Sequence, residues 1–122
     1  MPKINKVLLF LNKMVYESTS PAETLRFAKY YRKKGLEVLV VLWGPMGVLL
    51  GKKGKKHGLP EYDKKIKECM DMGVKFKCCK LASSLIGLEE NELIEGIEMV
   101  ESTEIAELFL SYQEEGQLII SL

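Results

Sequence analysis

The chain has 122 residues, enough for one domain that buries roughly two-thirds of its unfolded surface. Its 47% hydrophobic and 29% charged residues exclude a disordered chain. The apolar run near its N-terminus, Val7–Leu11, is too short for a signal segment or a membrane span, which predicts a cytoplasmic protein. The net charge of +1 conceals a net +11 in residues 1–80 and −10 in residues 81–122, a segregation that argues against nucleic-acid binding and favours internal pairing or contact between subunits.

The first third of the chain predicts two buried strands joined by a helix. The continuous apolar run Val7–Leu11 is typical of a strand covered on both faces of a parallel sheet. Ser20-Pro-Ala-Glu23 predicts a helix start with Ser20 as the cap, and Lys33-Lys-Gly35 predicts its end. Val38–Trp43 predicts the second buried strand.

A glycine-rich turn, Gly44–Gly47, and a basic loop, Lys52–His57, follow that strand. The turn lacks the spacing and the hydroxyl of a phosphate-binding loop. The basic loop contains the only histidine and is either a solvated connection or a cover that attracts an anion or an acidic partner. No cysteine lies at a metal-binding spacing from His57, so we expect no metal site.

The rest of the chain continues the alternation of helices and strands. Apolar residues at helical spacing from Tyr62 to Gly73 predict a helix whose buried face includes Cys69, and Val74–Cys78 predicts the next strand. Leu85–Leu88 is expected to be a helical turn, Glu89–Glu95 a short helix and Ile97–Val100 a short strand. A helix capped by Ser102 is expected over residues 102–115, and Leu118–Leu122 is expected to be a closing buried strand. This order predicts a single α/β domain over residues 1–122, a three-layer α/β/α sandwich with a mainly parallel sheet of about five strands.

Two adjacent thiols end the Val74–Cys78 strand. Alternation places Cys78 in the core with Val74 and Phe76, whereas Cys79 is expected to leave the strand register where the chain turns. Lys77, Lys80 and the amides of the next turn favour a thiolate at Cys79. Because no triad, C-x-x-C pair or disulfide framework is evident, Cys79 is either a lone nucleophile suited to transfer of sulfane sulfur or a thiol without function.

The spacing around Cys79 resembles that of the DsrE/DsrF-like family of sulfur-relay proteins. The resemblance rests on Gly73-Val-x-Phe-x-x-Cys79, on Gly87 eight residues later, on Leu88–Gly96, and on Lys33-Lys-Gly35 and Trp43–Gly47 in the first half. It implies a three-layer domain that assembles as a trimer or hexamer and a persulfide carried on Cys79. Cys78 and the basic loop have no counterpart in this pattern.

The sequence therefore predicts a cytoplasmic sulfur carrier or sulfurtransferase that passes sulfane sulfur from Cys79 to a partner protein. Five residues are expected to surround the reacting thiol: Trp43, Gly44, Gly47, Lys80 and Ser83. We expect no cofactor, no metal, and neither nucleic acid nor membrane as a partner. The alternative is a non-catalytic oligomeric binding module that holds a small ligand or an anion at the strand ends near Lys52–His57.

Overall fold

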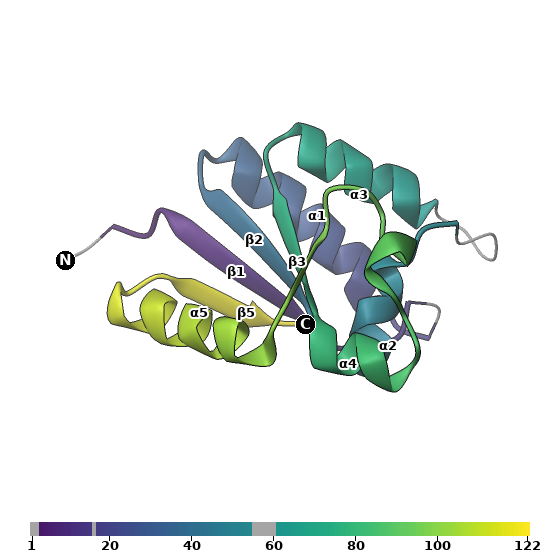
Figure 1. Ribbon diagram of the computed structural model, residues 1–122. Helices are drawn as coiled ribbons and strands as arrows, with labels where there is room; N and C mark the ends of the chain where they lie inside the picture. Colours follow the sequence, from purple (N-terminus) through teal and green to yellow (C-terminus); the bar gives the residue numbers. More distant parts are fainter. Residues whose placement is uncertain (1–2, 16, 55–60) are drawn as a thin grey trace.

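The computed structural model describes residues 3–15, 17–54 and 61–122 of the chain (Figure 1). Five strands form one sheet in the order β4-β3-β2-β1-β5, and every neighbouring pair is parallel. The strands are β1 (Lys6–Leu11), β2 (Glu37–Leu42), β3 (Lys75–Cys79), β4 (Glu98–Val100) and β5 (Leu118–Ser121). Because all five run the same way, their carboxyl ends meet at one edge of the sheet.

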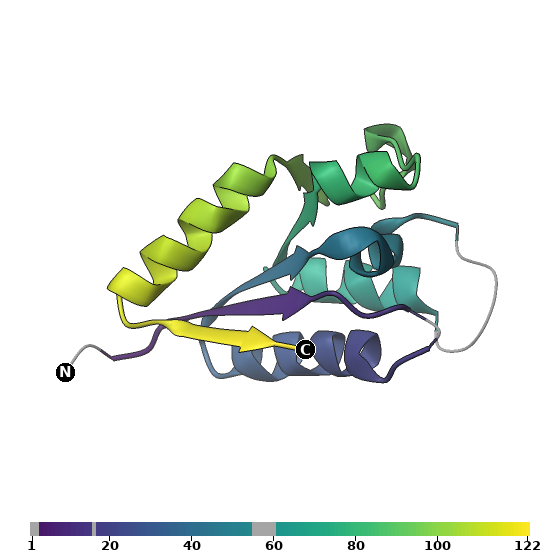
Figure 2. The ribbon, with the colours of Figure 1, turned by 90° about the horizontal axis from the view of Figure 1, so that it is seen from below.

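Helices cover both faces of this sheet, which confirms the predicted three-layer α/β/α sandwich. Figure 2 shows α1 (Ser20–Lys33) on one side of the sheet and α5 (Ser102–Glu114) on the other. The α3 helix (Tyr62–Asp71) packs beside α1, where the Cys69 thiol donates to the Leu25 carbonyl at 3.7 Å. None of the described helices combines the length and apolarity needed to cross a bilayer.

Two short helices lie at the carboxyl ends of the strands. The α2 helix (Gly44–Val48) follows β2 and continues into a 3-10 turn, Leu49–Gly51, whereas α4 (Lys80–Leu85) begins directly after β3. The two helices pack against each other beyond the sheet edge. This arrangement brings the segments that follow β2 and β3 together, although they are more than thirty residues apart in the sequence.

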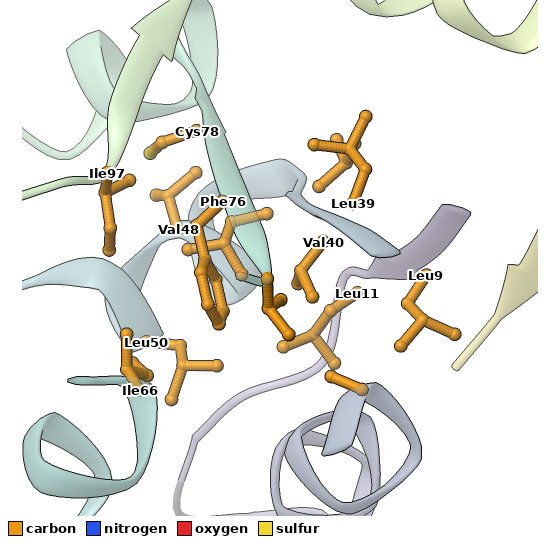
Figure 3. Packing of buried hydrophobic residues seen from close by; sticks show 14 of the residues in the cluster. Leu9, Leu11, Leu39, Val40, Val48, Leu50, Ile66, Phe76, Cys78 and Ile97 are labelled. Carbon is orange, nitrogen blue, oxygen red and sulfur yellow. The ribbon is translucent and has the colours of Figure 1, made fainter. Parts of the chain in front are cut away.

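The core fills both sides of the sheet, under α1 and α3 on one side and under α5 on the other. Val7, Leu8 and Leu9 in β1 are fully buried in succession, as expected for a strand covered on both faces. Figure 3 shows Phe76 and Cys78 of β3 in the same buried cluster as Val48. Cys78 is therefore a core residue, as its place in the strand alternation predicts.

Several local predictions are wrong. The α1 helix begins at Ser20, but the Ser20 side chain does not cap its N-terminus, and Gly44–Gly47 forms most of the α2 helix instead of a turn. The Glu89–Glu95 segment contains only a 3-10 turn, Glu90–Glu92, closed by reciprocal hydrogen bonds of Glu89 and Glu92. The last strand is an edge strand with half-buried side chains, because nothing pairs with the outer side of β5 in the described structure.

The end of β3 also differs from the prediction. Cys79 remains in the strand register and lies opposite Val100, because β4 extends the ladder by one residue beyond the predicted end. The α4 helix then starts at Lys80, five residues before the predicted helical turn at Leu85. Cys79 thus occupies the junction itself, with extended backbone angles of φ −69° and ψ 121°.

Candidate functional site

The candidate site lies around Cys79, at the carboxyl end of β3. Val100 of β4 lies beside it in the sheet, and on the other side the last β2–β3 pair joins Leu42, the residue before Trp43, to Cys78. Only 2% of the Cys79 surface is exposed, and Cys78 is fully buried. The sequence pattern predicts a buried thiol only at Cys78. In the structure of the single chain, both thiols are buried.

The two thiols point to opposite faces of the sheet. Successive strand residues alternate, so Cys78 shares the α3 side with Phe76, and Cys79 shares the opposite side with Lys77. The ammonium group of Lys77 contacts Glu104 of α5 at 2.9 Å, which identifies this second side as the α5 face. A bond between the two sulfurs is therefore opposed by the strand geometry, since adjacent extended residues direct their side chains apart.

Both lysines that flank the thiols form ion pairs. Lys77 contacts Glu98 at 3.3 Å as well as Glu104, and Lys80 contacts Glu101 at 3.2 Å. The hydrogen bond from Lys77 to Glu104, followed by the one to Glu98, raises the pKa of Lys77. The positive charge expected to stabilise a Cys79 thiolate is thus largely matched by carboxylates from the acidic third of the chain.

Ser83 links the two cysteine residues from within α4. This fully buried hydroxyl donates to the Cys79 carbonyl at 2.8 Å and lies 3.3 Å from the Cys78 sulfur. A serine hydroxyl has one proton, so its bond to the carbonyl leaves only its oxygen lone pairs for Cys78. The Cys78 thiol must then donate, which requires its protonated form. Burial raises the pKa of this thiol to about 11.

This raised pKa predicts a loss of stability in alkaline solution. The ordinary pKa of the Cys78 thiol is 9.0, so the unfolded chain releases this proton at lower pH than the folded chain. The contribution of the protonated Cys78 thiol to the free energy of unfolding is complete below pH 9 and is lost as the pH rises toward 11. Tyr112, whose pKa is raised to about 12, also makes the protein less stable as the pH rises. Denaturant unfolding across this range should show a shallower decline in Cys78→Ala. An identical decline in both proteins would contradict this account of Cys78.

The side chain of Trp43 joins an aromatic row beside the site. Its ring centroid lies 5.7 Å from that of Phe10, which in turn lies 5.2 Å from that of Phe109 on α5. Gly44 adopts a positive φ of 73°, which glycine adopts without strain. A Cβ at Gly47 would lie 2.4 Å from the Leu11 carbonyl oxygen, so the absence of a side chain here lets α2 pack on the end of β1.

The predicted anion site near the basic loop is only partly described. Residues 55–60, and with them His57 and two of the lysines, lie outside the described residues. A groove of about 540 Å³ begins beside Lys53. Its charged lining contains as many acids as lysines: Lys53, Lys64, Lys67, Asp63, Asp71 and Glu95. This balance does not favour an anion over other ligands.

Sequence reasoning missed the carboxylates of the site and the linking role of Ser83. The charge segregation indicates internal pairing in general, and Lys77–Glu98, Lys77–Glu104 and Lys80–Glu101 are such pairs. The individual partners depend on strand order, which places β4 next to β3. The role of Ser83 depends on α4 starting at Lys80, because a later start would not bring its hydroxyl to the Cys79 carbonyl.

Comparisons with known proteins agree with this architecture. A sequence model of the DsrE/DsrF-like family matches residues 5–114. An uncharacterised protein of Methanopyrus kandleri, MK0008, is 32% identical over 97 residues, which are 79% of each chain.

Solved structures share the fold across nearly the whole chain. The ychN protein from E. coli superposes with a TM-score of 0.84 at 24% identity, covering 98% of this chain and 100% of that one. Protein MTH1491 from Methanobacterium thermoautotrophicum has a TM-score of 0.71 at 20% identity, covering 96% of this chain and 98% of that one. These structures show a common arrangement of sheet and helices.

Proposed function

The chain belongs to the DsrE/DsrF-like family, which is linked to sulfur relay, and from this premise we propose that it carries sulfane sulfur as a persulfide on Cys79. The observation that supports the proposal is the position of Cys79. It ends β3 at the sheet edge where ligands gather in parallel α/β folds, and its side chain lies on the opposite face of the sheet from that of Cys78. The cytoplasm, where thiols stay reduced, is the compartment that suits this chemistry.

The proposed step is a thiol–persulfide exchange. The Cys79 thiolate attacks the outer sulfur of a donor persulfide, R–S–SH. A new sulfur–sulfur bond forms on Cys79, the donor's sulfur–sulfur bond breaks, and the donor leaves as its thiolate. The acceptor thiolate later repeats the same exchange on the Cys79 persulfide, so no net oxidation or reduction occurs.

Loading requires a local movement. At 2% exposure the Cys79 sulfur has almost no surface through which a donor could approach, and a reacting atom must come within bonding distance. The surrounding side chains must therefore shift before exchange occurs. Side-chain and loop movements take place on picosecond to microsecond timescales.

The experiment that tests the proposed function is mass spectrometry of the protein before and after treatment with inorganic polysulfide. We expect the intact mass to increase by one sulfur atom and peptide mapping to place it on Cys79. Addition of a small thiol should remove the sulfur and restore the original mass. A protein that takes up no sulfur would instead fit the alternative, a non-catalytic binding module.

We also propose that the protein is a homo-oligomer, a trimer or hexamer as the family resemblance implies. The opposite charges of residues 1–80 and 81–122 favour contacts between copies, although several of these charges pair within one chain. Added salt should weaken the assembly, because contacts between exposed charges are screened. Light scattering at micromolar concentration checks this prediction, and a monomer at low salt would contradict it.

A further inference from the structure

The carboxyl end of the sheet bears a cluster of exposed apolar side chains. Leu81 and Leu85 of α4 are 61% and 71% exposed, and Ile86 at the end of the helix is 38% exposed. Met46 of α2, the helix that packs against α4, is 45% exposed. We call these four residues the α4 surface.

This grouping differs from the scattered apolar residues of an ordinary protein surface. The other large hydrophobic side chains that the described structure exposes lie singly on three separate segments: Ile4, Tyr30 and Leu110. Single exposed leucines need no explanation, whereas a group of them on adjoining elements is typical of a docking site. Two other residues of α4, Ala82 and Ser83, are buried and anchor the helix in the protein.

The charged residues that follow α4 in the sequence are acidic. Residues 81–122 contain ten acidic residues and no lysine or arginine, and the exposed Glu89 and Glu90 follow Ile86 closely in the chain. Lys80, the only cation of α4, pairs with Glu101 at 3.2 Å. The backbone amide of Lys53 donates to the carbonyl of Glu92, two residues after Glu90.

We propose that the α4 surface docks the protein that exchanges sulfur with Cys79, and that this partner presents apolar side chains rimmed by lysine or arginine. The inference rests on the proposed function. Cys79 immediately precedes the first residue of α4, so a partner bound there brings its thiol to the correct end of the sheet. Acidic surroundings favour a basic rim, and they disfavour two copies meeting through this same surface, since like charges would face each other.

The test uses the full chain, loaded with inorganic polysulfide, and a synthetic acceptor peptide. The peptide is an amphipathic helix with leucines on one face, lysines beside them and a single cysteine. A second peptide replaces each lysine with glutamate. We expect the lysine peptide to accept sulfur about tenfold faster, because complementary charge raises the association rate by this amount or more.

Variants assign this preference to the α4 surface. The double variant Leu81→Ser/Leu85→Ser should lose the advantage of the lysine peptide, and Glu90→Lys should reduce it. The matched control is Leu110→Ser, which alters a leucine of α5 that is 54% exposed and should keep the full preference. All variants should load sulfur from inorganic polysulfide as well as the unaltered chain does.

Two results would overturn the inference while leaving the proposed function intact. The first is normal polysulfide loading combined with an unchanged peptide preference in both Leu81→Ser/Leu85→Ser and Glu90→Lys. The second is a change of oligomeric state in Leu81→Ser/Leu85→Ser but not in Leu110→Ser, which would assign the surface to a contact between subunits. Failure of Cys79 to load from polysulfide would overturn the proposed function and this inference together.

Discussion

Replacing Cys79 with serine is expected to abolish uptake of sulfane sulfur. A serine hydroxyl cannot form the sulfur–sulfur bond that holds the cargo, so no persulfide can form at this position. The fold should remain intact, because serine is of similar size and extended backbone at the strand end suits it. Intact-mass measurement after polysulfide treatment checks the loss, and thermal unfolding checks the fold.

The matched control is Cys78→Ser, which changes the adjacent thiol on the opposite face of β3. Its hydroxyl would lie near Ser83, a hydrogen-bond partner at 3.3 Å from the present sulfur, so we expect a cost of about 1 kcal/mol in unfolding free energy. Sulfur loading should persist. Sulfur found by peptide mapping on Cys78 or Cys69 would contradict the assignment to Cys79.

Gly47→Ala is expected to cause the largest loss of stability at the carboxyl edge of the sheet. The added Cβ would lie 2.4 Å from the Leu11 carbonyl oxygen and 3.0 Å from the Asn12 Cα. Both contacts are with backbone, which cannot rotate away, so α2 must move off the end of β1. Overpacking of this kind costs about 1–3 kcal/mol, and a backbone contact belongs at the upper end of that range.

Gly51→Ala provides the comparison. A Cβ there meets side-chain carbons of Leu42 and Ile97 at 3.0 and 3.2 Å, and side chains can shift by a few tenths of an ångström. Denaturant unfolding should therefore show a smaller loss than for Gly47→Ala. Emission from Trp43, the only tryptophan, should change in Gly47→Ala because Trp43 is the N-cap residue of α2. Equal losses in the two variants would contradict the role given to the Leu11 backbone.

The sequence by itself determined the fold class and the course of most elements. Val7–Leu11 and Val38–Leu42 are continuous apolar runs, and such runs indicate strands covered on both faces, which in turn require helices on each side of a parallel sheet. The spacing of Tyr62, Ile66 and Cys69 likewise determined the buried face of α3. The place of Cys78 in the core followed from simple alternation with Phe76.

Only the tertiary structure decided which groups surround the thiols and which surfaces stay open. Apolar runs do not reveal strand order, so they could not show that β4 pairs with β3, that Glu98 and Glu104 hold Lys77, or that β5 lies at an edge. Local sequence patterns also do not predict the last residue of a strand when one additional pair extends the ladder. The pair Cys79–Val100 extends β3 by one residue in this way. Burial of Cys79 and exposure of Leu85 depend on contacts between distant segments, and a linear sequence pattern does not contain these contacts.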